Sequence, residues 1–359
     1  YLNGGSLNVE DSTFSALAQG SSPAGGGIYV QNASAQIIGS TFGRCSVSGN
    51  SGHGGAIYAF GGDSLTIQDS VFASNKNLGV DDDSNLHGGA IYVSNVDEVV
   101  IERSAFENNR VSISDSRLGY GGAISREGPG SMRISRSSFS GNSISSGRSL
   151  GGAVYSGCPN SGETAVTIEN STFSENSLTI DSDIGLAVGG ALAFSGGSCE
   201  SPTDVQIRFS TFSENSAVSA NEDDPAGRGG AFSATSASQA QISLYANIMY
   251  GNVADDRGPV CTTSTGVAET LGYNVFDDLT FCELGGEGSS ADTTDSPSLQ
   301  PLATALNGTV FYWFDPDTSS ALDLVPDTDC PETDQIGIPR PDGDFCDAGA
   351  FEYTPAFVP

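Results

Sequence analysis

The sequence predicts an all-β protein, a right-handed parallel β-helix of about eight coils. Three observations support this fold: a glycine-pair motif recurs along the chain, a Phe-x-x-Asn motif alternates with it, and short runs of alternating apolar and polar residues lie between them. Single repeats this short cannot bury a hydrophobic face, but stacked copies can. We expect residues 1–252 to form the solenoid and residues 253–359 to form an irregular, disulfide-containing extension packed on the last coils.

The glycine motif consists of two glycines followed by a small residue and an apolar residue. Successive copies lie 29 to 40 residues apart, a spacing typical of solenoid repeats. Glycine tolerates tight backbone bends, so we expect this motif to form one corner of each coil. The seven copies begin at Gly25, Gly54, Gly88, Gly121, Gly151, Gly189 and Gly229.

The second motif places a phenylalanine three residues before an asparagine. Stacked coils align phenylalanine with phenylalanine inside and asparagine with asparagine at a turn, where each side-chain amide hydrogen-bonds the next. After Phe42 the asparagine is replaced by Cys45, which we expect to be a buried free thiol. The predicted ladder comprises Asn75, Asn109, Asn142, Asn176 and Asn215.

Short strands connect the two motifs. Residues 65–68 and 166–169 alternate apolar and polar side chains with the period of a strand. A coil of consecutive strands replaces the helical crossovers that parallel strands otherwise need. Four polar insertions all lie between the asparagine and the next glycine pair, so we expect them to project from one edge: residues 78–86, 111–118, 178–187 and 217–226.

The chain is strongly acidic, with 13 Lys and Arg residues against 44 Asp and Glu residues and a formal net charge of -31. This charge repels nucleic-acid phosphates and anionic lipid headgroups, so neither is an expected partner. No apolar run approaches the roughly 20 residues of a membrane-spanning helix.

The repeated Gly-Gly-Ala-Ile and Phe-x-x-Asn motifs over about residues 1–252 resemble the repeat of polymorphic outer membrane proteins, a family of bacterial surface proteins and adhesins. Residues 271–274, 319–323, 334–341 and 346–352 resemble the closing segment of secreted bacterial β-helix proteins of the choice-of-anchor type. The resemblance implies a secreted, cell-surface location, and it names no catalytic residues.

Seven cysteines in a chain of extracellular type suggest three disulfides and one unpaired thiol. Cys158 and Cys199 follow the glycine-pair strand in adjacent coils, at a separation that a disulfide can span. The remaining local pairs are Cys261 with Cys282 and Cys330 with Cys346.

The two histidines of the chain, His53 and His87, precede the glycine pair in consecutive coils, and Tyr120 holds the equivalent place in the next coil. We expect the three rings to stack on one face. A metal or sugar contact is one interpretation of this stack. The alternative is a ring stack at a position that tolerates many residue types.

Clusters of carboxylates make calcium the only candidate cofactor. Carboxylate oxygens are the ligands that calcium prefers, although runs of acidic residues are also common in solvated loops. The clusters singled out for calcium are Asp81, Asp82 and Asp83, and Asp342 with Asp344.

Residues 1–9 align with residues 58–67, so the chain begins inside a coil. We expect either a piece of a longer rod or a subunit that pairs head to tail through the open first coil, because unpaired strand edges invite another chain.

The leading functional hypothesis is a non-enzymatic structural or adhesive module of a bacterial surface, with glycans or other surface proteins as partners. The alternative is a polysaccharide lyase or glycoside hydrolase on the same scaffold, since β-helices host both classes. Such an enzyme needs two neighbouring carboxylates, and Asp69 and Glu102 do occupy similar coil positions. The arginines are scattered, however, and the chain has a single lysine, Lys76, so we do not expect an enzyme.

Overall fold

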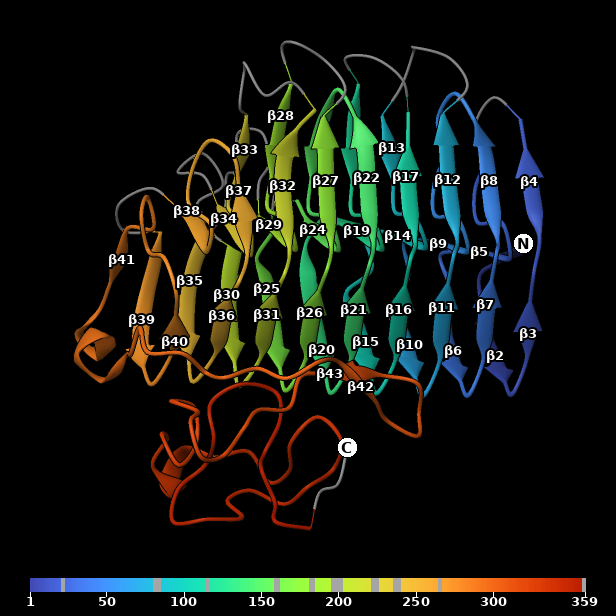
Figure 1. Ribbon diagram of the computed structural model, residues 1–359. Helices are drawn as coiled ribbons and strands as arrows, with labels where there is room; N and C mark the ends of the chain where they lie inside the picture. The colour runs from blue at the N-terminus through green and yellow to red at the C-terminus, as the bar shows by residue number, and fades with distance from the viewer. Residues whose placement is uncertain are drawn as a thin grey trace.

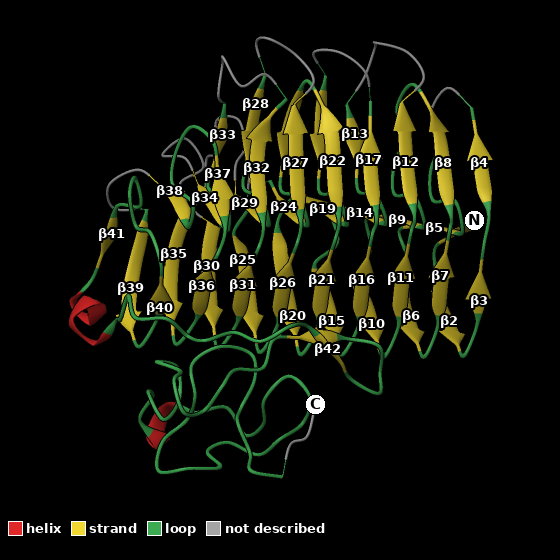
Figure 2. Cartoon of the chain, in the orientation of Figure 1, coloured by secondary structure: helices red, strands yellow, loops and turns green. Residues whose placement is uncertain are grey.

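The computed structural model is a rod of stacked parallel strands with an irregular C-terminal extension along one side (Figures 1 and 2). It describes residues 1–20, 23–79, 85–113, 117–157, 162–180, 185–194, 203–220, 226–234, 240–263 and 267–356. Within these residues each coil contributes one strand to each of three long sheets and, in most coils, further strands to two shorter ones. No helix in this part of the chain is long and apolar enough to cross a membrane.

The first sheet begins directly after the glycine pairs and has nine strands in the described residues. Its pairing is parallel and in register, so that Ile57 lies beside Ile91, and Ile91 beside Ile124. Its strands are β1 (Leu2–Asn3), β5 (Ile28–Gln31), β9 (Ile57–Phe60), β14 (Ile91–Ser94), β19 (Ile124–Glu127), β24 (Val154–Ser156), β29 (Leu192–Phe194), β34 (Phe232–Ala234) and β38 (Cys261–Thr263).

The second sheet carries the longest strands and positions the candidate site described below. Alternate residues point into the solenoid, so Leu65 and Ile67 of β10 are buried and Thr66 is half-buried. The strands are β2 (Ser6–Glu10), β6 (Ser34–Ile38), β10 (Ser64–Gln68), β15 (Glu98–Glu102), β20 (Gly130–Ser135), β25 (Thr164–Glu169), β30 (Thr203–Arg208), β35 (Ala240–Tyr245), β39 (Ala268–Gly272) and β41 (Leu284–Gly285).

The third sheet contains the phenylalanines of the Phe-x-x-Asn motif. Its strands are β3 (Thr13–Phe14), β7 (Thr41–Gly43), β11 (Val71–Ala73), β16 (Ala105–Glu107), β21 (Ser138–Ser140), β26 (Thr172–Ser174), β31 (Thr211–Ser213), β36 (Ile248–Tyr250) and β40 (Val275–Phe276).

Two shorter sheets complete the coils between the asparagine turn and the next glycine pair. The fourth comprises β4 (Leu17–Gln19), β8 (Ser46–Gly49), β12 (Lys76–Gly79), β17 (Arg110–Ser112), β22 (Ser143–Ser146), β27 (Ser177–Ile180), β32 (Ser216–Ser219) and β37 (Val253–Ala254). The fifth comprises β13 (Leu86–His87), β18 (Leu118–Tyr120), β23 (Arg148–Leu150), β28 (Leu186–Val188) and β33 (Gly227–Arg228). The predicted insertions connect these two sheets, and their middle parts lie outside the described residues.

Seven phenylalanine rings form one continuous stack in the interior. Neighbouring ring centroids lie 4.5 to 4.8 Å apart and the ring planes differ by at most 4°. Burying one such side chain contributes about 1.5–3 kcal/mol. The stack comprises Phe14, Phe42, Phe72, Phe106, Phe139, Phe173 and Phe212.

The asparagines form a buried ladder at the turn between the third and fourth sheets. Asn142 is representative: its Oδ1 accepts hydrogen bonds from both the backbone N–H and the side-chain amide of Asn109, and its Nδ2 donates to Phe106 O and to Asn176 Oδ1. The ladder runs through Asn75, Asn109, Asn142, Asn176, Asn215 and Asn252.

A second polar ladder, which the sequence analysis missed, lies at the turn between the second and third sheets. Each serine N–H donates to the serine Oγ of the next coil, as from Ser104 to Ser137 at 3.1 Å. The series passes through Asn247 and Asn274 and ends on Asp292, whose Oδ1 accepts from both nitrogens of Asn274. The serines are Ser12, Ser40, Ser70, Ser104, Ser137, Ser171 and Ser210.

The glycine pairs form the corner before the first sheet. Gly54 has a φ of +62°, which glycine adopts without strain, and a Cβ on Gly55 would overlap the carbonyl oxygen of Gly89 in the next coil. The second glycine is therefore required by the close approach of stacked backbones.

Coiling continues beyond residue 252, because β38, β39 and β40 pair in parallel with the preceding coil, with one register shift in β39 opposite Leu244 and Tyr245. The first and third sheets accordingly have nine strands, one more coil than expected. After β40 the chain adds β41 to the second sheet, forms the 3-10 turn η2 (Glu287–Ala291) and then leaves the solenoid.

The extension packs on the last coils and also runs back beside the rod, below the third sheet in Figure 1. It contains the antiparallel pair β42 (Ala303–Thr304) and β43 (Val310–Phe311) and the turn η3 (Asp327–Asp329). Hydrogen bonds from Asn307 to Arg103 O and from Val310 N to Ser138 Oγ tie it to middle coils. In the later coils the rod presents apolar side chains outward, including Phe209 and Ile248, which join the extension's own core.

Candidate functional site

Four adjoining pockets follow the outer face of the second sheet where the extension meets the rod. Their volumes are about 450, 390, 250 and 340 Å³ in order along the chain. Each pocket shares a lining residue with the next: Arg136 joins the first two, Arg208 the second and third, and Ser243 the last two. We call this row of pockets the extension groove.

Two columns of residues at the end of the second sheet supply much of the rod side of the groove. Parallel register aligns the last residues of successive strands, namely Gln68, Glu102, Ser135, Glu169, Arg208 and Tyr245. The residue after each of them bends the chain into the third sheet with a positive φ, as at Arg103, Arg136 and Asn170. The serine ladder fixes this bend in every coil, so the columns are held rigidly.

An ion-pair network occupies the first part of the groove. Arg103 donates to both carboxylate oxygens of Asp69 at 2.8 Å and lies 2.7 Å from Glu102. Glu102 also accepts hydrogen bonds from Arg136 and from Gln68. Partial burial raises the pKa of Glu102, but the donors and the two guanidinium groups outweigh it and hold the pKa below its usual range. Glu102 is therefore an ionised carboxylate engaged by three neighbours.

The second pocket contains polar atoms without hydrogen-bond partners. Arg133 and Arg208 form long ion pairs with the same carboxylate, Glu169, with nitrogen-to-oxygen distances of 3.9 and 3.5 Å. Within the described residues, Nε of Arg208 and Oδ1 of Asn170 are buried and make no hydrogen bond. The lining of this pocket thus holds an acceptor, Asn170 Oδ1, without a hydrogen bond, and a donor, Arg208 Nε, whose ion-pair partner Glu169 Oε2 lies 3.5 Å away, beside the 59% exposed side chain of Arg133.

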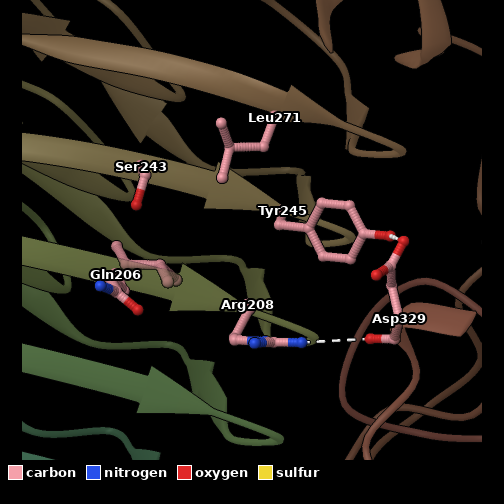
Figure 3. A pocket seen from close by; sticks show the side chains of 7 residues that line it. Gln206, Arg208, Ser243, Tyr245, Leu271 and Asp329 are labelled. Atoms are coloured by element: carbon pink, nitrogen blue, oxygen red, sulfur yellow. Dashed lines mark hydrogen bonds between the residues drawn. The ribbon is translucent and has the colours of Figure 1, made fainter.

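The third pocket is shown in Figure 3, where the extension contributes Asp329 opposite the strand residues. Arg208 donates to the backbone oxygen of Asp329 at 3.1 Å, and the Tyr245 hydroxyl donates to its Oδ2 at 3.4 Å. Burial, followed by the charge of Asp329, raises the pKa of Tyr245, so its hydroxyl stays protonated at neutral pH. The side chains of Gln206 and Ser243 add an amide and a hydroxyl to the floor.

This arrangement favours binding over catalysis. An amide, two carboxylates, two hydroxyls and a guanidinium group follow one another along the column of strand ends at the coil spacing of about 4.8 Å. Asp69 and Glu102, which the sequence places on one face, are brought together by Arg103 between them. Their oxygens are engaged in charge-assisted hydrogen bonds, which suits structural roles rather than proton transfer.

The predicted ring stack is present on the first and fifth sheets. The His53 and His87 ring centroids lie 5.9 Å apart, and His87 stacks on Tyr120 at 4.7 Å. Tyr58 and Tyr92 interleave with the histidines, so most ring faces are covered by other rings. Burial lowers the pKa of both histidines to about 4, so both are neutral at pH 7.

The structure forms two of the three expected disulfides, Cys261–Cys282 and Cys330–Cys346. The third candidate pair, Cys158 and Cys199, lies outside the described residues. Cys45 is a buried free thiol in the place of a ladder asparagine, and its N–H donates to Asn75 Oδ1.

The calcium candidates are not assembled into a site in the described residues. Asp81, Asp82 and Asp83 lie outside them, and Asp342 and Asp344 are exposed. No group of three or more His, Cys, Asp or Glu side chains in the described parts of the chain is arranged to hold a metal ion.

Sequence reasoning missed Asn170, Arg208 and Tyr245 as groove residues. A signal was available, because Asn170 directly precedes a serine of the polar ladder, and Arg208 and Tyr245 each lie two residues before the ladder residue of their coil. The partners from the extension, such as Thr333 and Asp329, had no signal, because they meet the rod only through long-range packing.

Comparison with known families identifies the scaffold. Residues 1–270 match the family described as right handed beta helix region. Comparisons with curated proteins and with solved structures give no match. The predicted fold class, an all-β right-handed parallel β-helix with a disulfide-containing C-terminal segment, is confirmed. The stacked parallel sheets and the family match agree, and the chain belongs to the right-handed β-helix family.

Proposed function

We propose that this chain is a non-enzymatic module of a secreted bacterial surface protein, related to the polymorphic outer membrane protein repeat and closed by a choice-of-anchor type segment. The module acts as a rigid rod that adheres to a glycan lying in the extension groove. The single observation that carries the glycan proposal is that Arg208 Nε and Asn170 Oδ1, in the lining of one pocket, make no hydrogen bond within the described residues.

A sugar hydroxyl both donates and accepts a hydrogen bond, and therefore complements this pair of groups. Buried polar groups without partners cost about 1–3 kcal/mol each, so a ligand that engages them gains affinity. The charge of the groove lining also permits a glycan to approach. In the first two pockets Arg103, Arg133, Arg136 and Arg208 balance the carboxylates of Asp69, Glu102, Glu169 and Glu332, whereas the whole chain carries -31.

The groove suits an elongated ligand parallel to the rod. Its pockets follow one another along the second sheet, and neighbouring coils repeat at about 4.8 Å. A polysaccharide can contact several coils at once, which raises avidity without any strong single contact.

A structural role is supported by the rigidity of the coils. The asparagine ladder and the serine ladder connect each coil to the next through buried side chains. Such a rod transmits force along its axis without bending at loops, as a surface spacer requires.

The test combines a glycan array with a polymer-cleavage screen on the full chain. We expect retention of at least one class of polysaccharide, no release of oligosaccharides, and an affinity loss of about tenfold or more in the Arg133→Ala, Arg208→Ala double variant. The matched control is Arg110→Ala, an exposed arginine on the fourth sheet, which should bind like the unaltered protein.

Three outcomes would contradict the proposal. Release of oligosaccharides would identify the chain as a polysaccharide lyase or hydrolase. Binding unaffected by the double variant would move the site elsewhere on the rod. The absence of binding to every glycan would leave a purely structural module.

A further inference from the structure

A charged side chain lies inside the solenoid and has no hydrogen-bond partner among the described residues. Arg126 is on β19 and is 1% exposed. Side chains of this strand point alternately outward and inward. Ser125 and Glu127 point outward and contact His87 and Tyr92 of the ring stack. Arg126 instead shares an interior column with apolar residues of other coils, which are Val30, Ala59, Val93, Phe194 and Ala234.

All three guanidinium nitrogens of Arg126 lack a hydrogen-bond partner among the residues that the structure describes. Its register partner in the next coil is Ser156, which is 2% exposed and whose Oγ also has no partner. Strand pairing brings the backbones of Arg126 and Ser156 to the spacing of about 4.8 Å between adjacent coils, and their side chains lie in the same interior column. Two unsatisfied polar side chains are therefore neighbours within an otherwise apolar column.

This pair of groups requires a ligand that accepts hydrogen bonds and carries negative charge. A buried cation without a counter-charge costs several kcal/mol, and water supplies hydrogen bonds but no charge. Glu127, the next residue, does not compensate, because its oxygens are directed to Tyr92 and His87. The interior is close-packed, so the ligand must be small.

We propose that Arg126 and Ser156 form a buried binding site for a small monovalent anion of the size of chloride. The guanidinium N–H groups and the Ser156 hydroxyl donate to the ion, which neutralises the arginine and links two coils. This site is independent of the extension groove and of the proposed glycan-binding function.

The test measures thermal unfolding of the full chain at constant ionic strength, with gluconate replaced by sodium bromide from 1 to 100 mM. We expect the unfolding temperature to rise by about 3 °C across this range. Crystals soaked in bromide should show one anomalous peak between Arg126 and Ser156.

Variants separate a specific site from a general salt effect. Arg126→Met should fold, because apolar residues occupy the equivalent position in other coils, and it should lose the bromide dependence and the anomalous peak. Ser156→Ala should shift the dependence to about tenfold higher bromide. Arg110→Met, on the exposed edge, should keep the full response.

The proposal is overturned if the unaltered protein shows no bromide dependence and no anomalous peak, which would mean that water alone solvates Arg126. It is equally overturned if Arg126→Met retains the response, since the ion would then bind elsewhere.

Discussion

The coils and the extension satisfy their buried polar groups in opposite ways. In the coils, each Asn or Ser pairs with the same residue type one coil away, so the arrangement repeats. In the extension, one arginine, Arg340, serves a unique cluster: it donates to Glu352 and to the backbone oxygens of Asp347 and Gly349. The repeat distributes stability over many equal contacts, whereas the extension concentrates it in a few buried charges.

The largest expected effect tests whether the stability of the extension depends on its few buried charges. Arg340→Met should destabilise the docked extension by about 3–5 kcal/mol, because it leaves buried carboxylates without a counter-charge. Glu352 is 1% exposed, and Asp334 and Asp347 are also buried. Limited proteolysis with mass spectrometry should find cuts within residues 296–356 while the coils remain protected. A variant whose extension stays as resistant as in the unaltered protein would contradict this account, and the exposed Arg110→Met serves as the control.

The next effect tests the repeat. Asn142→Ala should lower the free energy of unfolding of the rod by about 3 kcal/mol, because it leaves groups of Asn109, Asn176 and Phe106 unsatisfied. Urea unfolding followed by circular dichroism measures the loss. Asn252→Ala, at the last rung, should cost less, because in the described residues Asn252 donates only to Phe212 O. Equal losses at the two positions would argue against a cooperative ladder.

The two regions should also respond to pH with opposite sign. Burial, and then the charge of Glu352, raise the pKa of Asp347 to about 7. Its folded pKa lies above its unfolded value, so this contribution to docking is present at low pH and is lost as pH rises toward 7. His53 and His87 have a lowered pKa of about 4, so their contribution is present above about pH 6.5 and is lost as pH falls toward 4.

Acidification from pH 8 to pH 5 should therefore protect the extension against proteolysis while it weakens the coils. Hydrogen exchange resolved by region measures both trends in one experiment. Asp347→Asn should reduce the pH dependence of the extension and leave that of the coils unchanged; part should remain, because burial also raises the pKa of Asp334 and of Glu352. Parallel trends in the two regions would contradict these assignments.

The smallest effect concerns the rung that breaks the repeat. Cys45→Asn should stabilise the rod by about 1 kcal/mol, because an amide at this place can donate to Phe14 O and to Asn75 Oδ1, as ladder asparagines do. The free energy of urea unfolding measures the gain. Burial also raises the pKa of the Cys45 thiol, so a maleimide probe should label it only after unfolding.

Sequence reasoning recovered what the repeat determines. Aligned phenylalanines and asparagines predicted the interior stack and one ladder, because identical residues in register must meet. The serine ladder is encoded in the Ser-x-Phe pattern at Ser104 and Ser137. Serine is so common in this chain, however, that the pattern does not stand out from the sequence. The groove could not be predicted, since Thr172 meets Gln335 from 163 residues away. The extension has no repeated pattern from which that contact could be predicted.

The serine ladder also gives the rod a chemical direction. Every rung points from a backbone N–H toward the coil that follows, and the last acceptor is the carboxylate of Asp292. The N–H of Asp292, which would begin another rung, turns back instead to Ser289 O. Asp292 therefore acts as a terminating monomer does in a directional polymer: it accepts the final bond and offers none onward. The serine ladder therefore ends because Asp292 has no free N–H to donate to a further coil, and not because a bulky segment covers it.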